Sequence, residues 1–425
     1  MNKLMLYRDI KYNTLFEGIC RLAGGTYQED WQSTVGSLVS MAEAHGFSGN
    51  IWNCFLSHVI ANNENVFSCA CEIRGYADGS INDFARMDFA VFRQLFNCDM
   101  SYLDNLYHTK IFSLIGNYSV AEGAGQVFNR EVRDSIVRLA SDLSGAADDE
   151  AFFLSVVKFY KEIGVGKYGL HKAFSVMNRD GRVMINPITK TADNRLSDLV
   201  GYEQQKRKLI ENTEAFVSGR PANNCLLFGD AGTGKSTSIK ALLNEYYSRG
   251  LRLIELYKHQ LKDLPEIIRQ VKNRNYRFII YMDDLSFEDY ETDYKYLKAV
   301  IEGGLERKPE NVLIYATSNR RHLVRENYSD KIRSDDELHT ADTVQEKLSL
   351  AYRFGVTIYF GKPDKRSFQQ IVRTLAQRRG INMPDDELML EANKWEIAHG
   401  GMTGRTAEQF ITHLLGTGTS QEDKG

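Results

Sequence analysis

The chain has 425 residues, which is too long for one compact core and predicts two or three domains. A hydrophobic content of 43%, a charged content of 26% and a net charge of −3 are those of an ordinary globular protein and argue against wholesale wrapping of nucleic acid. No apolar stretch is long enough to cross a bilayer and residues 1–8 lack a signal-peptide core, so we expect a cytoplasmic protein without a membrane segment.

Residues 1–165 are predicted to form a mostly helical N-terminal domain. Apolar residues recur at helical spacing, as at Val35, Leu38 and Ala42, and aromatic residues are dense. The core of a helical bundle explains this pattern better than a ligand pocket does. A surface that binds a partner is the alternative, and the sequence does not decide it.

Residues 166–195 are predicted to be a connector. Two short apolar runs, at 174–177 and 183–185, flank the turn sequence Asn178-Arg-Asp-Gly181, which indicates a hairpin. The polar stretch after Pro187 is typical of a linker.

A helix is predicted to follow residue 196, and from residue 225 onward strands are predicted to alternate with helices, which indicates a parallel sheet covered on both faces. Three further helical patterns follow Pro363, and residues 417–425 form a small polar tail. The expected strands are 225–228, 251–257, 277–282, 311–317 and 356–360, and the expected helices are 204–216, 261–273, 294–307, 364–379, 384–399 and 404–415.

Residues 229–236 have the pattern G-x-x-x-x-G-K-S of a phosphate-binding loop, with a strand-length apolar run before it and a helical pattern after it. Its glycines let successive N–H groups point at phosphate oxygens, and the following helix offers its N-terminus. Lys235 would reach the β- and γ-phosphates and Ser236 would ligate magnesium. A chance match in a surface loop is the alternative. The residues expected to hold the nucleotide phosphates are Gly229, Asp230, Ala231, Gly232, Thr233, Gly234, Lys235, Ser236 and Thr237.

Polar side chains end the third and fourth predicted strands. Asp283 would join the magnesium shell beside Ser236, and Asp284 would orient or deprotonate the attacking water. Glu288 is the alternative base, because an Asp side chain is one methylene shorter than Glu. Asn319 is the candidate that hydrogen-bonds the γ-phosphate or the water. Ordinary polar turns at the strand ends would explain the same residues without a site.

These features resemble those of the AAA+ ATPases over residues 196–416, and within that superfamily an uncharacterised bacterial ATP-binding family. The stretches that carry the resemblance are Leu199-Val-Gly-Tyr-Glu203, Asp283-Asp-Leu-Ser-Phe-Glu288, Asn311-Val-Leu-Ile-Tyr-Ala-Thr-Ser-Asn-Arg-Arg321, Glu346-Lys-Leu-Ser-Leu350, Arg353-Phe-Gly355 and Gly404-Arg-Thr-Ala-Glu-Gln-Phe410. The resemblance implies an α/β P-loop NTPase with a five-stranded parallel core at 196–361 and a helical lid at 362–416.

The resemblance also implies roles for single residues. Val200 and Gly201 match the segment that packs on adenine, and Arg353 matches the arginine finger that a neighbouring subunit inserts. Arg405 matches the second sensor, which couples the lid to the phosphates. The alternative for Arg353 is an ion pair with the acidic residues at 335–337, and for Arg405 a solvated arginine at a helix start.

The chain departs from the AAA+ pattern in two places. The paired acids are Asp-Asp rather than Asp-Glu, which puts the hydrolysis rate in doubt, and residues 257–260 lack the pore loop of protein-threading members. The basic residues of the first lid helix suggest contact with nucleic acid, although a solvated helix face is the commoner explanation.

We therefore expect an oligomeric, ring-forming ATPase that uses ATP and Mg²⁺ to remodel an unidentified protein or protein–nucleic-acid client. A nucleotide-gated switch or scaffold with little turnover is the alternative. Transfer of phosphate to a small molecule is disfavoured, because Asp283, Asp284 and Asn319 suit the activation of water.

Overall fold

The computed structural model describes residues 4–25, 30–120, 129–288, 291–303, 309–319, 323 and 350–417. The chain divides into two compact units, Met1–Lys172 with Pro187–Lys190 and Ala173–Asn186 with Thr191–Gly425. In the described ranges, no helix has the length and apolar character needed to cross a membrane.

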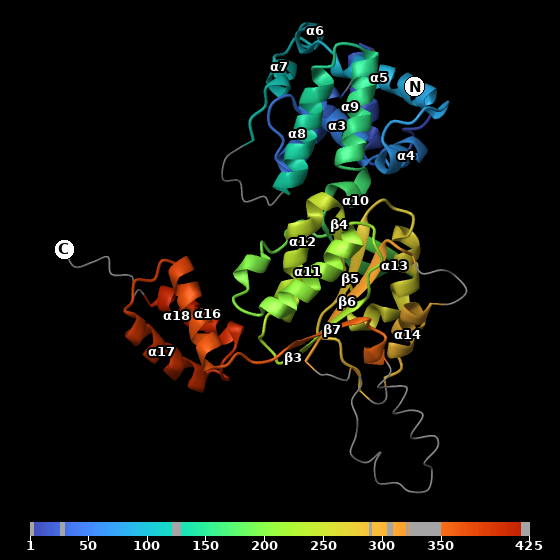
Figure 1. Ribbon diagram of the computed structural model, residues 1–425. Coiled ribbons are helices and arrows are strands. Elements are labelled where there is room, and N and C mark those ends of the chain that lie inside the picture. Colours follow the sequence, from blue (N-terminus) through green and yellow to red (C-terminus); the bar gives the residue numbers. More distant parts are fainter. Residues whose placement is uncertain are drawn as a thin grey trace, which may run out of the picture. The chain divides into compact units, whose positions relative to one another are not determined.

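The first unit is helical, as the sequence predicts (Figure 1). Its centre is α3, whose residues from Ile51 to Ala61 are all buried. A helix that is buried on every side needs other helices around it. The helices are α1 (Asn13–Ala23), α2 (Trp31–His45), α3 (Ile51–Asn62), α4 (Val66–Arg74), α5 (Ile81–Phe96), α6 (Met100–Leu106), α7 (Ile111–Gly116), α8 (Arg130–Ser144), α9 (Asp149–Glu162) and α10 (Gly166–Leu170).

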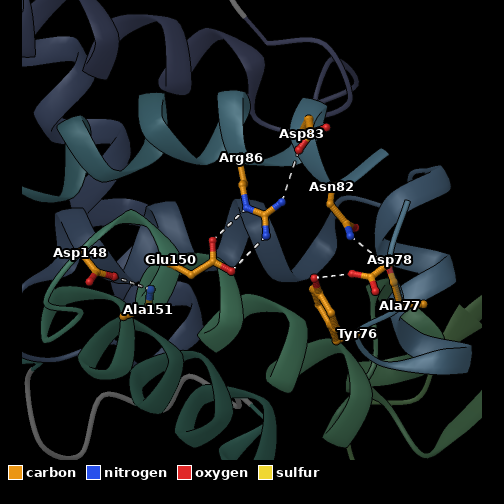
Figure 2. A network of polar contacts seen from close by, with 9 residues as sticks. All are labelled: Tyr76, Ala77, Asp78, Asn82, Asp83, Arg86, Asp148, Glu150 and Ala151. Carbon is orange, nitrogen blue, oxygen red and sulfur yellow. Dashed lines mark hydrogen bonds and ion pairs between the residues drawn. The ribbon is translucent and has the colours of Figure 1, made fainter. Parts of the chain in front are cut away.

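Polar contacts fix the ends and the pairing of these helices. The buried Asp88 carboxylate on α5 accepts hydrogen bonds from the backbone N–H groups of Met5, Leu6 and Tyr7 at 2.7, 2.8 and 3.1 Å, which ties the N-terminal segment to the bundle. Arg86 of α5 forms a bidentate ion pair with Glu150 of α9 at 2.9 and 3.0 Å (Figure 2). Trp52, Phe89, Phe92 and Phe96 are buried in the core of this unit, which is the role that the bundle interpretation predicts for its aromatic residues.

The second unit contains a sheet of seven strands rather than the five that we predicted. The five expected strands are present, and the two additional ones are the hairpin of the predicted connector. The strand order is β2-β1-β4-β5-β6-β3-β7. The strands are β1 (Ala173–Arg179), β2 (Arg182–Pro187), β3 (Cys225–Gly229), β4 (Leu251–Glu255), β5 (Arg277–Met282), β6 (Val312–Ser318) and β7 (Val356–Phe360).

The hairpin joins the sheet because β1 pairs in parallel with β4, with Phe174 opposite Ile254. Asp180 and Gly181 form its two-residue turn, with φ angles of 51° and 75°. Positive φ at both positions is the conformation that the common hairpin turns require. A connector that looks local in the sequence therefore widens the sheet by two strands.

Helices cover both faces of the sheet, with α11 and α12 on one side and α13 and α14 on the other (Figure 1). The three helices after β7 pack on one another around Phe368 and Phe410, and they form the predicted lid. The helices of this unit are η1 (Leu196–Asp198), α11 (Glu203–Val217), α12 (Lys235–Tyr246), η2 (Tyr247–Arg249), η3 (Lys258–Asp263), α13 (Leu264–Val271), α14 (Tyr294–Glu302), α16 (Lys365–Arg378), α17 (Asp385–Ala398) and α18 (Gly404–Gly416).

Candidate nucleotide-binding site

The phosphate loop connects β3, which lies between β6 and β7, to the N-terminus of α12. Gly229 has a φ of 131°, and a Cβ atom there would lie 2.2 Å from the Phe360 carbonyl oxygen of β7. Gly234 has a φ of 89°, and a Cβ atom there would lie 2.3 Å from Leu199. Only glycine fits at these two positions, because the backbone is left-handed and the neighbouring atoms are too close.

Lys235 lies at the centre of the site. Its ammonium group donates to the carbonyl oxygens of Gly229 at 3.0 Å and Asp230 at 2.6 Å, and to Asn319 Oδ1 at 3.0 Å. Burial lowers the pKa of Lys235 below its ordinary value, and nearby carboxylates, Asp230 first, oppose that effect. A cation that is partly desolvated gains from an arriving anion, which is the property a phosphate-binding lysine needs.

Asp283 follows β5 and lies next to the loop. Its Oδ1 atom accepts hydrogen bonds from the Ser236 hydroxyl at 2.5 Å and the Thr317 hydroxyl at 2.6 Å. Desolvation raises its pKa, but these hydrogen bonds lower it by more, so the pKa of Asp283 lies below its ordinary value. The two predicted magnesium ligands, Ser236 and Asp283, are therefore in contact, and the carboxylate is ionised at neutral pH.

Asp284 is in the left-handed region, with a φ of 50°. Its backbone N–H donates to the Thr317 hydroxyl at 2.9 Å, and its carboxylate accepts from the Asn319 amide at 2.8 Å. Asn319 therefore connects Lys235 of the loop to Asp284 of the next strand end. Asp adopts the left-handed conformation more readily than most residues do, so this backbone conformation fits Asp284 at the strand end.

These groups line one pocket of about 520 Å³. The polar side contains most of the phosphate loop and the two acids, and the apolar side is formed by Leu199 and Val200 with Ile371 and Leu375 of α16. The lining residues are Asn194, Asp198, Leu199, Val200, Tyr202, Ala231, Gly232, Thr233, Gly234, Lys235, Ser236, Thr237, Asp283, Asp284, Thr317, Asn319, Ile371, Leu375, Gly404, Arg405 and Glu408.

Five of the predicted site residues do not line this pocket. Gly201 lies between two lining residues, Gly229 accepts a hydrogen bond from Lys235, and the Asp230 carboxylate contacts Lys362 instead. Glu288 is held by a backbone contact, in which its N–H donates to Glu291 Oε2 at 2.7 Å. Arg353 forms an ion pair with Glu302 at the end of α14. The acidic residues at 335–337, the alternative partner of Arg353, lie outside the described residues.

The basic residues of the first lid helix are partly engaged within the chain. Arg373 pairs with Asp385 at 2.7 and 2.9 Å. Arg378 donates to the carbonyl oxygens of Ser197 and Asp198 at 2.6 and 3.0 Å. These contacts favour a structural role for the two arginines over contact with nucleic acid.

The sequence motifs give no role to several residues that complete the pocket. Thr317 falls within the AAA+-like stretch at 311–321, but no motif gives it a role, and the apolar wall from Ile371 and Leu375 belongs to a helix predicted only as lid. Their spacing predicts that Ile371 and Leu375 share the apolar face of a helix. Only the fold places that face at the pocket.

A magnesium ion fits the residues present. In the described part of the chain, no three His, Cys, Asp or Glu side chains form a metal cage on their own. One carboxylate and one hydroxyl are what Mg²⁺ takes from a protein when nucleotide phosphates and water fill its other positions. Ser236 and Asp283 would supply them.

A parallel sheet with a phosphate loop, paired acids and an Asn on the neighbouring strand defines a P-loop nucleotide-binding protein of the AAA+ type. The chain belongs to the family described as "Protein of unknown function (DUF815)", whose model matches residues 170–418. That match begins near β1, so the hairpin is part of the family's domain.

Curated relatives of this chain include other proteins of the AAA+ type. The large subunit of replication factor C from Staphylothermus marinus is 30% identical over 86 residues, which is 20% of this chain and 20% of that protein. A homologue of 26S proteasome regulatory subunit 4 from Saccharomyces cerevisiae is 26% identical over 157 residues, which is 32% of this chain and 36% of that protein. The chain therefore spans only a fifth and about a third of these relatives.

Among solved structures, the RuvB Holliday junction branch migration motor of Thermotoga maritima overlaps with a TM-score of 0.38 at 15% identity. The overlap covers 52% of this chain and 64% of that one.

Proposed function

We propose that this protein binds ATP with Mg²⁺ in the pocket between the phosphate loop and the lid, hydrolyses it, and uses the cycle to remodel a protein or protein–nucleic-acid client. The observation that carries the proposal is the convergence of Lys235, Ser236, Asp283, Asp284 and Asn319 on one pocket. These residues come from a loop and two strand ends that are far apart in the sequence. Chance matches to each motif would not place them together.

The proposal assigns one task to each group. The loop N–H groups and Lys235 hold the phosphates, while Ser236 and Asp283 hold Mg²⁺, which neutralises charge on the phosphates when it is bound. Asp284 orients the attacking water and accepts its proton. The apolar wall of Val200, Ile371 and Leu375 receives the base.

Arg353 has a place in this proposal only in an oligomer. Within one chain it lies outside the pocket and pairs with Glu302. An arginine in that position acts on a nucleotide only if a neighbouring subunit presents it, as the AAA+ resemblance implies. Arg405 lines the pocket of its own chain and would contact the phosphates from α18.

A second candidate is a switch that binds ATP and turns it over very slowly. The observation that favours it is Asp284 itself, which has a shorter side chain than Glu and whose carboxylate accepts a hydrogen bond from Asn319 at 2.8 Å. A base that is held in this way has less freedom to reach a water.

Calorimetric titration with ATP, with and without Mg²⁺, tests the proposal. Lys235→Ala should weaken binding about tenfold or more, because a charge-assisted contact to phosphate is lost. Lys208→Ala removes the same charge from the exposed surface of α11 and is the matched control, with affinity unchanged. Equal affinities for the wild type and Lys235→Ala would refute binding at this site. Tight binding without phosphate release at saturating ATP would favour the switch.

A further inference from the structure

The phosphate loop contains an acidic residue, Asp230, that is poorly suited to binding an anion. A carboxylate close to a polyphosphate repels it. Asp230 is half-buried, and it does not line the pocket. Its Oδ2 atom accepts the backbone N–H of Lys362 at 2.9 Å instead. The side chain that looks misplaced in the loop therefore has a specific partner elsewhere.

That partner lies in the lid hinge, which we define as residues 361–364, between the end of β7 and the start of α16. Two other contacts fix the two residues that precede Lys362. The Asp230 N–H donates to the Phe360 carbonyl at 2.9 Å, and the Tyr202 hydroxyl donates to the Gly361 carbonyl at 3.0 Å. Phe360 and Gly361 are thus held through their carbonyl groups, whereas Lys362 is held through its N–H group by the Asp230 side chain of the phosphate loop.

The loop reaches the lid at a second point. The Arg405 N–H, in the first turn of α18, donates to the Gly232 carbonyl at 3.2 Å. A Cβ atom on Gly232 would lie 3.0 Å from the Thr403 hydroxyl, which shows how closely the loop and the lid pack. Two residues of one short loop therefore contact the hinge before the lid and the first turn of its last helix.

We propose that Asp230 is a positioning residue that ties the phosphate loop to the lid hinge through the Lys362 N–H, so that the lid follows the position of the loop. This inference rests on the proposed function. Asp230 acts without touching phosphate, because its carboxylate is engaged with the hinge. Its side chain therefore connects the nucleotide site to the lid hinge.

A set of variants tests this assignment by hydrogen exchange of the hinge and by kinetics. Asp230→Ala should speed exchange of amides at 360–368 about three- to tenfold, because a hydrogen bond to a charged group is lost. It should lower kcat about fivefold or more, since loop and lid are uncoupled, and leave the Kd for ATP within about threefold of the wild type or tighter. Asp230→Asn keeps an acceptor oxygen, so its exchange rate and its kcat should lie between those of the wild type and those of Asp230→Ala.

Lys362→Pro removes the donor instead of the acceptor. Lys362 precedes Pro363, so its backbone is already restricted to the extended region that proline adopts. Lys362→Pro should lower kcat as Asp230→Ala does, and the double variant should be no slower than either single variant, because both remove one contact. This variant also keeps the proposal testable if Asp230→Ala does not fold.

Asp364→Ala is the matched control. Asp364 is two residues further along and caps α16, since its carboxylate accepts the Ser367 N–H at 2.8 Å. Asp364→Ala should speed amide exchange at the start of α16. Because it removes a different contact, any change that it causes in kcat should add to the change caused by Asp230→Ala in the double variant.

Two results would overturn the assignment. One is a loss of ATP affinity in Asp230→Ala as large as in Lys235→Ala with unchanged hinge exchange, which would place Asp230 in the phosphate site. The other is full additivity of Asp230→Ala and Lys362→Pro. Hydrogen exchange of the hinge is measured without nucleotide, so it tests the contact between Asp230 and Lys362 even if the wild type binds no ATP. Absence of ATP binding would refute the proposed function and leave the result for this contact unaffected.

Discussion

The Thr317 hydroxyl joins the two acids that follow β5. It donates to the Asp283 carboxylate at 2.6 Å and accepts the Asp284 N–H at 2.9 Å. One hydroxyl thus helps to keep Asp283 ionised and holds the left-handed backbone of Asp284. In the proposed mechanism, both acids therefore depend on a residue that has no catalytic role of its own.

Thr317→Val changes the shape of the side chain very little, but it should lower both the stability of the fold and the apparent affinity for Mg²⁺. It leaves the partly buried Asp284 N–H without its acceptor and removes a donor from Asp283, and we expect a loss of about 1–2 kcal/mol in the free energy of unfolding. The apparent affinity for Mg²⁺ in ATP hydrolysis should fall as well. Denaturant titration and a magnesium titration measure the two effects. Thr317→Ser keeps the hydroxyl, and a loss as large as that of valine would contradict this role.

The lowered pKa of Asp283 predicts how pH affects stability. Its folded-state pKa is below the ordinary value of 3.8, so between the two values the unfolded chain binds more protons. The stabilisation is complete above pH 3.8 and is lost as pH falls through the folded pKa. The difference in unfolding free energy between the wild type and Asp283→Asn should shrink below that pH. A difference that grows on acidification would contradict the assignment.

At the level of single residues, the motifs predicted the loop, the acids and Asn319, because spacing along the chain carries that information. Thr317 could not be assigned in this way. Its contact depends on the pairing of β5 with β6, in which Met282 lies opposite Ala316, so that Asp283 and Thr317 follow side by side. The register between distant strands is set by packing, so it cannot be predicted from the sequence of either strand alone.

At the level of elements, the β1–β2 hairpin shows the same limit. The turn residues and the two apolar runs predicted a hairpin correctly. They could not predict that β1 pairs with β4, since the partner begins more than seventy residues later, with Ala173 opposite Leu253. The sheet is therefore wider than the five-stranded core that the resemblance implied.

Gly181→Val should destabilise this hairpin. A β-branched residue at a φ of 75° is strained, and we expect a loss of about 1–2 kcal/mol in the free energy of unfolding. Nucleotide affinity should be unchanged, because the hairpin does not line the pocket. Arg182→Val, which places the same side chain on the exposed, extended next position, is the control. An equal loss in both variants would show that the turn conformation is not the cause.

At the level of the whole molecule, the proposed mechanism requires more than one subunit for each active site. Arg353 and the pocket belong to the same unit, yet Arg353 pairs with Glu302 rather than lining the pocket. In the proposed assembly, a complete site takes Lys235 from one copy and Arg353 from another.

Mixing inactive subunits tests this arrangement. Lys235→Ala and Arg353→Ala should each hydrolyse ATP at least about a hundredfold more slowly than the wild type. An equimolar mixture should recover activity, because some interfaces then combine an intact pocket with an intact arginine. Lys235→Ala mixed with the double variant has no such interface and should stay inactive. No recovery in the first mixture would mean that Arg353 acts within its own chain or not at all.

The most direct measurement is the rate of ATP hydrolysis per subunit as a function of protein concentration, with Lys235→Ala as the control. The proposed mechanism predicts a specific rate that rises with concentration and then levels off as subunits assemble, with no rate in the control. A rate that is flat with concentration and no higher than that of Lys235→Ala, while ATP still binds, would contradict a hydrolytic cycle shared between subunits.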